Sequence, residues 1–311
     1  MRCFLTIVLA GVCVLSASAQ KKEKPATTWK TGGLFSVAGA QTGNRNWAPA
    51  GSEKYSITAA INLDLWANKA WNKNTWTNNL DLAYALVNTS SHGIRKVNDK
   101  FDFFSKYSYA LNGPWGIGSI GGLRTQITNA YDYNDPTVGG RKRVSGFFAP
   151  AYLNFSPIGL QYKTANNTFS AHFGPAMRWV IVTNEPYSLV NQGGIKPDGS
   201  RERTIAEMYG VDPGKQVKFE VGPYLNAMFK KEVLKNVTWK TRLDLNLDLV
   251  ESNDVDVYWT NTINMKVNNW LSVNYNFDLY ADDDVKMFGP DKNAARTQLL
   301  SLLGVGLGVK F

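Results

Sequence analysis

The stretch Val237-Thr-Trp-Lys-Thr-Arg-Leu-Asp-Leu-Asn-Leu-Asp-Leu249 carries an apolar side chain at nearly every second position and a polar or charged one between. Because successive side chains of a β-strand point to opposite faces, this stretch predicts a strand with one apolar face and one charged face. Lys240, Arg242 and Asp244 occupy the middle of the charged face rather than its ends. Such a strand is expected to have water or polar groups on one side and an apolar environment on the other.

The same two-residue period recurs along the chain and predicts about twelve strands. Strands of soluble proteins usually have about five or six residues, whereas a tilted strand that crosses a membrane needs about 9 to 11. The longer class fits the segments 29–41, 54–67, 75–88, 99–111, 114–130, 146–163, 168–183, 215–231, 236–250, 254–267, 270–282 and 297–311. The sequence therefore predicts an all-β fold, a single antiparallel transmembrane β-barrel.

The links between these segments alternate in length. Every second link is short: Asn112-Gly113, Ala165 to Asn167, Glu232 to Lys235, Asn268-Asn269, and a slightly longer one around Trp71. The other links are long, at 42–53, 89–98, 132–144, 184–214 and 283–296, except for 251–253. Outer-membrane barrels have short periplasmic turns and longer extracellular loops, and this alternation predicts that arrangement.

The N-terminus predicts export. Arg2 precedes an apolar run from Leu5 to Leu15, and Ala17-Ser-Ala19 supplies the small residues of a signal-peptidase site. We expect a signal peptide at 1–19 with cleavage after Ala19, a short periplasmic tail at 20–28 and an outer-membrane barrel at 29–311. Lipid attachment at Cys13 is the weaker alternative, because the preceding Val12 is branched.

Tryptophan positions agree with this orientation. Six of the ten tryptophans lie beside predicted periplasmic turns: Trp66, Trp71, Trp76, Trp115, Trp239 and Trp270. Amphipathic indole rings concentrate at the boundary between membrane and water. We predict an aromatic girdle at this rim.

The chain ends on an alternating strand whose last residue is Phe311. A terminal aromatic in this pattern resembles the assembly signal by which the barrel-assembly machinery recognises its clients, which implies that insertase and periplasmic chaperones as transient partners. The formal net charge of +9 suits contact with outer-membrane lipid and anionic lipopolysaccharide, although solvated lysines explain it equally well. Nucleic acid is not an expected partner of an exported protein.

Several stretches resemble an uncharacterised outer-membrane barrel family of the Bacteroidota, a domain-of-unknown-function family. They include Asn46-Trp47, the segments 209–222 and 235–245, Asp254-Val-Asp-Val-Tyr-Trp259 and the closing Leu-Gly-Val-Gly-Leu-Gly-Val-Lys-Phe311. The resemblance implies the fold and the location. It implies no catalytic residue.

Residues suited to catalysis are few. The chain has two histidines, and His172 lies on the predicted inward face, where Gly174 offers no nucleophile. A Ser-His hydrolase would need pairing with a distant serine. Asp282-Asp-Asp284 is either a cation site or a solvated loop. We expect no enzyme activity, no cofactor and no metal site.

The predicted inward face carries charges of both signs. The candidate lumen-lining residues are Arg124, Arg178, Lys218, Glu220, Lys240, Arg242, Asp244 and Asp248. Such residues either select polar or anionic solutes in a small channel or pair with one another and close the lumen. A channel or transporter is the first interpretation, a non-conducting barrel that binds partners through the 184–214 loop is the second, and an outer-membrane hydrolase is the third.

Overall fold

Twelve long strands form a closed antiparallel barrel in the computed structural model, which describes residues 28–43, 55–132, 142–183, 199, 203–250, 254–289 and 293–311. The strands are β1 (Lys30–Gly43), β2 (Tyr55–Trp71), β3 (Asn74–Thr89), β4 (Gly93–Ala110), β5 (Trp115–Thr125), β8 (Ala151–Lys163), β9 (Phe169–Ile181), β10 (Val217–Leu234), β11 (Val237–Leu247), β12 (Val255–Lys266), β13 (Leu271–Ala281) and β16 (Gln298–Lys310). Each pairs with its neighbour in the chain, and β16 closes the ring against β1. The all-β, twelve-stranded antiparallel barrel is thereby confirmed.

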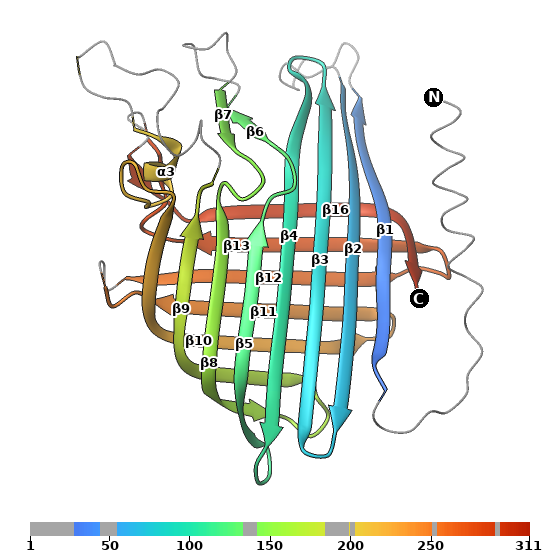
Figure 1. The fold of residues 1–311 in the computed structure, drawn as a ribbon. Helices are drawn as coiled ribbons and strands as arrows, with labels where there is room; N and C mark the ends of the chain where they lie inside the picture. The colour runs from blue at the N-terminus through green and yellow to red at the C-terminus, as the bar shows by residue number, and fades with distance from the viewer. Residues whose placement is uncertain are drawn as a thin grey trace.

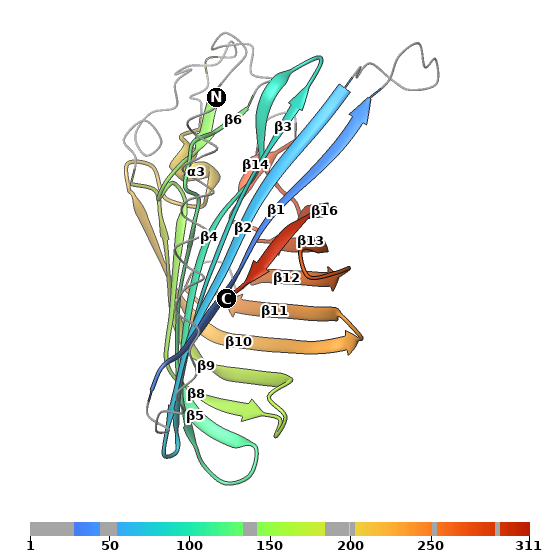
Figure 2. The ribbon, with the colours of Figure 1, turned by 90° about the vertical axis from the view of Figure 1, so that its right-hand side faces the viewer.

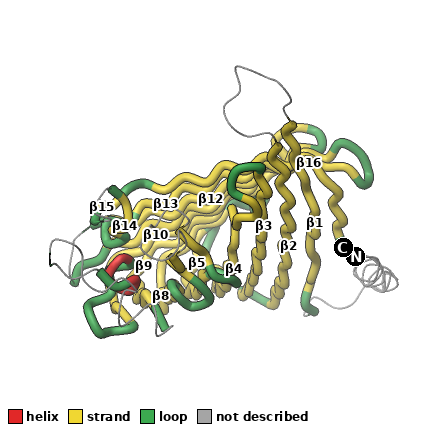
Figure 3. Tube along the Cα trace, turned by 90° about the horizontal axis from the view of Figure 1, so that it is seen from above, coloured by secondary structure: helices red, strands yellow, loops and turns green. Residues whose placement is uncertain are grey.

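Strands on opposite sides of the barrel cross in projection. In Figure 1, β1 to β5 run nearly vertically in front, while β10 to β13 and β16 run across them behind. Figure 3 shows β1 to β4 along one stretch of the wall and β8 to β13 along the other. Closing a sheet into a barrel requires strands tilted to the barrel axis, so opposite walls cross.

Side chains alternate between the outer and inner faces as the period predicted. The outer face of β16 is apolar, with Leu303, Val305 and Leu307 each at least half exposed (58%, 50% and 55%). Polar residues such as Asp102, Asn226 and Asp244 are buried instead, at 2%, 0% and 2% exposure. This is the reverse of a soluble protein and matches a barrel surrounded by hydrocarbon.

The five short turns lie at one end of the wall, which we call the short-turn rim; the opposite end is the long-loop rim. Asn72, Gly113, Asn167 and Asn236 each adopt a positive φ in a separate turn at the short-turn rim. Glycine and asparagine tolerate this left-handed conformation better than other residues, and two-residue hairpin turns require it. The sequence therefore fixes tight reversals at this rim.

Three predictions about the links and the aromatic girdle were wrong. The link expected at 89–98 is only Ser90 to His92, because Arg95 and Lys96 continue the ladder opposite Val87 and Leu86. The longer turn expected around Trp71 is only 72–73, since β2 runs through Trp71. Trp66 points inward, where its ring packs over Gly32, so it is not part of the outer girdle.

Short elements decorate the long-loop rim: β6 (Ala130–Asp132) pairs with β7 (Lys142–Ser145), β14 (Lys286–Phe288) pairs with β15 (Ala294–Ala295), and α3 (Ile205–Met208) is a single helical turn. The predicted strands 114–130 and 146–163 are consequently shorter, because their outer ends leave the wall and form this extra hairpin. The predicted signal peptide, most of the tail and most of the 184–202 segment lie outside the described residues. None of the described helices is both long and apolar enough to span a membrane.

Candidate functional site

The lumen contains the charged residues that the sequence placed on the inner face. Arg124, Arg178, Lys218, Glu220, Lys240, Arg242, Asp244 and Asp248 all contact inward-facing groups of other strands or of the segments that follow them. They form three layers between the long-loop rim and the middle of the barrel. Each layer joins opposite parts of the wall.

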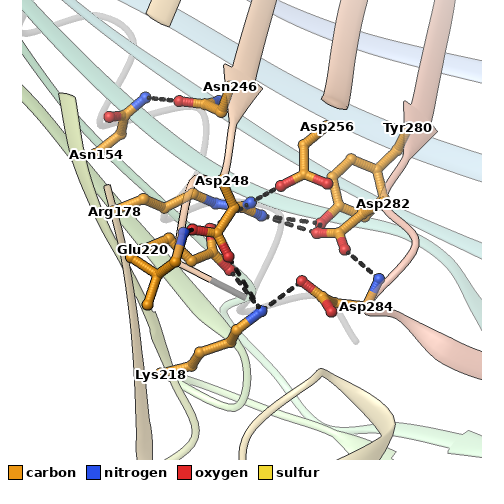
Figure 4. A network of polar contacts seen from close by, with 11 residues as sticks. Asn154, Arg178, Lys218, Glu220, Asn246, Asp248, Asp256, Tyr280, Asp282 and Asp284 are labelled. Carbon is orange, nitrogen blue, oxygen red and sulfur yellow. Dashed lines mark hydrogen bonds and ion pairs between the residues drawn. The ribbon is translucent and has the colours of Figure 1, made fainter. Parts of the chain in front are cut away.

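Arg178 of β9 is the centre of the outermost layer (Figure 4). Its guanidinium donates to Glu220 at 2.9 Å, to Asp282 at 2.8 Å and to Asp256. Tyr280 donates its hydroxyl proton to Asp282 at 2.5 Å. Arg178 itself is 6% exposed, so three carboxylates surround one cation that is almost excluded from water. Such a cluster is rigid, because every member loses partners if one moves.

Lys218 of β10 balances the acids beside this cluster (Figure 4). Its ammonium group lies 2.5 Å from Asp284, 3.3 Å from Glu220 and 4.0 Å from Asp248. Lys218 and Asp248 are both buried. Together with Arg178, this lysine ties β9, β10 and the ends of β11 and β13 into one network.

Arg242 of β11 forms the middle layer. Its Nη2 lies 3.1 Å from Asp102 of β4, and its Nε donates to Asp244 at 2.8 Å. The guanidinium of Arg124 stacks 3.4 Å from the ring of Tyr258, which is inward-facing on β12. Two arginines and an aromatic ring thus fill the space between β4, β5 and the opposite wall, an arrangement in which cation–π contact adds to the ion pairs.

Lys240 forms the third layer, closer to the short-turn rim. Its ammonium group lies 2.8 Å from Asp64 of β2 and 3.3 Å from Asp81 of β3. These side chains are more exposed than the others, at 21%, 33% and 28%. The lumen is therefore wetter at this level.

An apolar cap lies over the Arg178 cluster at the long-loop rim. We define the cap as residues 203–211 with Val285. Ile205, Ala206 and Val211 are at most 1% exposed and pack with residues of the wall, including Val180 and Val182. Burial raises the pKa of the Tyr209 hydroxyl above its ordinary value, so this group stays neutral in the cap.

Local hydrogen bonds hold the cap in shape. The Thr204 hydroxyl accepts from the amide of Glu207 at 3.2 Å, and the Glu207 carboxylate accepts from the amide of Thr204 at 2.6 Å, which is a capping box. Arg203 donates to the carbonyl of Lys286 at 2.8 Å. The cap is thus fastened to the β14 segment as well as to the wall.

Ser156 and His172 meet within the wall, which answers the question of a serine partner for this histidine. The Ser156 Oγ lies 2.8 Å from Nε2 of His172 and donates its proton to the carbonyl of Pro175 at 2.7 Å. Gln161 Nε2 lies 3.2 Å from His172 Nδ1 and also donates to the carbonyl of Tyr107. All bonds are satisfied if His172 is neutral with its proton on Nε2.

That tautomer is unsuited to catalysis. A general base must present an unprotonated nitrogen to the serine, whereas in this tautomer the nitrogen facing Ser156 carries the proton. Ser156 and His172 are both 0% exposed, which leaves no room for a substrate. The arrangement gives each of these buried polar side chains a hydrogen-bond partner.

Two of the three aspartates at 282–284 are engaged with protein cations. Asp282 pairs with Arg178 and Asp284 with Lys218. Within the described ranges no group of three or more His, Cys, Asp or Glu residues has an arrangement suited to a metal ion. The cation site considered from the sequence thus has its carboxylates occupied by Arg and Lys.

Phe311 closes the ladder between β1 and β16. Its amide donates to the carbonyl of Gly33 at 3.1 Å, and the amide of Gly33 donates back at 2.9 Å. The ring is half exposed at the short-turn rim. Its role as an assembly signal stays a prediction.

Some residues of the lumen networks were not found from the sequence. The alternation of side chains places Tyr258, Asp256 and Asp282 on the inner face. Nothing in their spacing shows that Arg124 and Arg178 are their partners. Ser156 was hidden by the irregularity between β8 and β9, where the register shifts between Phe155 and Leu160. The available signal was Pro157, which has no backbone N–H to donate to a β-ladder and follows Ser156 directly.

One family model matches part of the chain. The family DUF3078, described as proteins of unknown function, matches residues 39–131, which is less than half of the chain. No curated protein matches the sequence.

Solved structures similar to this chain are outer-membrane barrels. The translocator domain of the autotransporter NalP from Neisseria meningitidis has 7% identity and a TM-score of 0.35, with 98% of this chain and 96% of that one covered. An outer membrane channel from Pseudomonas putida F1 has 10% identity and a TM-score of 0.39, with 94% and 98% covered. These likenesses concern the fold alone.

Proposed function

We propose that this chain is an integral outer-membrane β-barrel whose lumen is closed, and that it serves as a non-conducting structural or surface-interaction barrel. The apolar outer face and the two unlike rims support the membrane location. The export signal predicted at 1–19 and the resemblance to a Bacteroidota barrel family are consistent with it. Outer-membrane lipid, lipopolysaccharide and the assembly machinery are the partners that this location implies.

The observation that carries the closed-lumen proposal is direct contact between opposite walls. Arg242 joins β11 to β4, and Lys240 joins β11 to β2 and β3. Above them the Arg178 cluster and the apolar cap lie in sequence toward the long-loop rim. A water-filled pore needs continuous space along the axis, whereas these layers interrupt it.

Planar-bilayer recording of refolded protein tests this proposal, after heat-modifiable gel mobility has shown that the barrel is folded. We expect no discrete conductance steps from the wild type. Steady, ion-selective steps would overturn the proposal. Leu249→Asp, which alters an exposed residue of the long-loop rim, is a matched control that should stay silent.

A gated channel is the second candidate function, and one observation favours it. The layers beneath the cap are polar and charged, and the cap itself is joined to the wall by apolar packing and hydrogen bonds. Ile205→Asp would place a charge in the buried cluster and expel the cap. If this variant conducts polar or anionic solutes while Leu249→Asp does not, the cap is a gate; if both are silent, the barrel is a scaffold.

A further inference from the structure

Lysines dominate the inner face of the barrel at the short-turn rim. Residues opposite each other in the ladder share a face, and every second residue of a strand returns to it, so the register shows which side chains face inward. Apart from the Lys240 layer, the inward-facing lysines near this rim are Lys30, Lys106, Lys163, Lys230 and Lys266, which we call the lysine ring. In the described part of the chain, Glu232 is the acidic side chain at an inward position here, and its carboxylate accepts from the amide of Asn236 in the adjoining turn.

The outermost layer of the described lumen, at the other end of the barrel, has the opposite excess. Its two cations, Arg178 and Lys218, are surrounded by the carboxylates of Glu220, Asp248, Asp256, Asp282 and Asp284 (Figure 4). The inner surface is therefore negative toward the long-loop rim and positive toward the short-turn rim. Such a field raises the local concentration of anions at the positive end.

Lys106 of β4 lies at the base of the lysine ring and lacks a carboxylate partner. It is 8% exposed, and among the described residues the polar contact of its ammonium group is with Ser170 Oγ, at 3.5 Å. By comparison, Arg178, Lys240 and Arg242 each have a carboxylate oxygen within 3.1 Å. Burying a cation without a counter-ion is costly. The surroundings of Lys106 thus supply a binding group for an anion and no anion of the protein.

Two more donors lie beside Lys106. Lys163 of β8 is opposite Ser170 of β9 in the ladder, and its charge is close enough to repel that of Lys106. The Ser170 hydroxyl accepts from Lys106, and no acceptor for its own proton is found among the described residues. Figure 2 shows β5, β8 and β9 following one another along the wall, and β4 pairs with β5. Neighbouring parts of the wall therefore bring two cations and one hydroxyl donor together.

Water reaches this end of the lumen. Lys163 is exposed, and Lys240 and Asp64 at the next level are 21% and 33% exposed. Arg242 and Asp102, in the layer beyond, are only 11% and 3% exposed. A dissolved anion can therefore approach Lys106 from the short-turn rim without passing the layers that close the lumen.

We propose that Lys106, Lys163 and Ser170 bind the phosphate group of a small soluble compound that enters from the short-turn rim. The two ammonium groups neutralise the phosphate, and the Ser170 hydroxyl donates to one of its oxygens. A doubly charged oxyanion matches two lysines and a hydroxyl better than chloride does, because it offers both the charge and several acceptor atoms. The site requires the barrel fold, and it does not depend on whether the lumen is closed.

The competing explanation is that Lys106 loses its proton and serves as a neutral structural group. A neutral amine would remove the cost of burying the charge. It would not account for the second lysine beside Ser170 or for the excess of lysines around this rim. A barrel in which Lys106 is only structural has no saturable phosphate site, so a binding measurement separates the two explanations.

Equilibrium dialysis against radiolabelled inorganic phosphate tests the proposal. The full-length mature barrel is refolded in a detergent that contains no phosphate, and its heat-modifiable mobility is checked first. Potassium chloride at physiological ionic strength screens lysines that act only through their diffuse field. We expect saturable binding with a single class of site. Binding that does not saturate, or no binding, would overturn the proposal.

A pair of lysine variants separates the site from the general positive charge of the rim. Lys106→Met removes the buried ammonium group, and we expect roughly tenfold weaker phosphate binding or less. Lys231→Met removes the same charge from the outer face of the same rim, opposite Trp239, and should bind as the wild type does. Equal losses in the two variants would contradict the proposal. If Lys106→Met does not fold, Lys163→Met replaces it, because Lys163 is exposed.

A pair of serine variants tests the hydroxyl contact without a change of charge. Ser170→Ala should weaken phosphate binding by roughly threefold to tenfold, as expected for the loss of one hydrogen bond. Ser272→Ala is the control, since Ser272 faces inward on β13, on the far side of the ring of strands. An unchanged affinity in Ser170→Ala would contradict the assigned contact.

Competition in the same dialysis identifies the source of the phosphate group. Glycerol phosphate carries it on a soluble compound, and short-chain phosphatidylglycerol carries it on a lipid. Displacement of inorganic phosphate by glycerol phosphate supports the soluble ligand, whereas displacement by the lipid alone would overturn it in favour of a headgroup. Conductance steps in bilayer recordings would overturn the closed lumen without altering these results, so the two proposals fail separately.

Discussion

Arg242 of β11 reaches across the lumen to Asp102 of β4, with Nη2 3.1 Å from Oδ2, and the two side chains are only 11% and 3% exposed. Arg242 also holds Asp244 of its own strand at 2.8 Å. One cation therefore neutralises two carboxylates that have little contact with water. The stability of the barrel should therefore depend far more on Arg242 than on a residue of an ion pair at the surface.

Replacing Arg242 tests this dependence. Arg242→Ala leaves Asp102 and Asp244 buried without their cation, and we expect a loss of about 3 to 5 kcal/mol in the free energy of unfolding. Urea unfolding of the reconstituted barrel measures it. Lys215→Ala breaks an exposed ion pair with Asp212 (66% and 58% exposed) and should leave the urea unfolding curve unchanged. Equal midpoints for wild type and Arg242→Ala would contradict the structural role.

The wetter Lys240 layer should behave differently. Its partners Asp64 and Asp81 are about one third exposed, so solvent screens the attraction. A double-mutant cycle with Lys240→Met and Asp64→Asn should give a coupling of about 1 kcal/mol or less, and it should shrink in high salt. A coupling that is large and insensitive to salt would show that water is excluded at this level.

The capping box at Thr204 should control local opening of the cap. Thr204→Ala removes the acceptor of the Glu207 amide and should cost the cap about 1 kcal/mol, equivalent to roughly fivefold faster opening. Hydrogen exchange of the amides at 205–211, followed by mass spectrometry, reports it. Thr204→Ser keeps the hydroxyl and is the control. Unchanged exchange in Thr204→Ala would mean that apolar packing alone holds the cap.

Gly118 of β5 should not tolerate a side chain. A Cβ there would collide with the carbonyl oxygen of Tyr107 and lie 2.7 Å from Gln161 Nε2, whereas at Gly122 the nearest atom would be 3.7 Å away. We expect Gly118→Ala to lose the heat-modifiable folded band and Gly122→Ala to keep it. Normal folding of Gly118→Ala would show that β4 and β5 can separate at this point.

His172 should matter for stability and not for hydrolysis. His172→Ala leaves Ser156 and Gln161 without a partner, and each unsatisfied buried group costs about 1 to 3 kcal/mol. We expect a lower urea midpoint and no esterase or phospholipase activity in the wild type or in the variant. Hydrolysis by the wild type that disappears in Ser156→Ala, with stability unchanged, would restore the hydrolase hypothesis.

The barrel was predictable because its signal is local. In β11, Val237, Leu243 and Leu245 face outward and Lys240 and Arg242 face inward, as an alternation of two requires. The same local rule placed β13 and β16. It was wrong at 89–98, where a polar run looks like a loop although its backbone pairs with β3. Backbone pairing is indifferent to side-chain polarity, and that explains the error.

The partners within the lumen were not predictable. Arg242 and Asp102 are 140 residues apart, and Lys240 and Asp64 are 176 apart. The tilt and stagger of the strands in the closed wall decide which inward residues meet. Neither quantity can be derived from the spacing of residues along one strand. The cap escaped prediction for the same reason, since the 184–214 segment carries no alternation that shows where it packs.

The long separation of the lumen pairs also sets an order of assembly. Asp64, Asp81 and Asp102 belong to the first strands of the chain, whereas the cations that neutralise them, Lys240 and Arg242, come with β11. Asp102, which is only 3% exposed, would be unpaired in a dry interior if it were buried before its cation arrived, at a large cost. The nascent barrel must therefore keep its inner surface hydrated until the later strands are in place, and expulsion of that water is coupled to the final curling of the sheet.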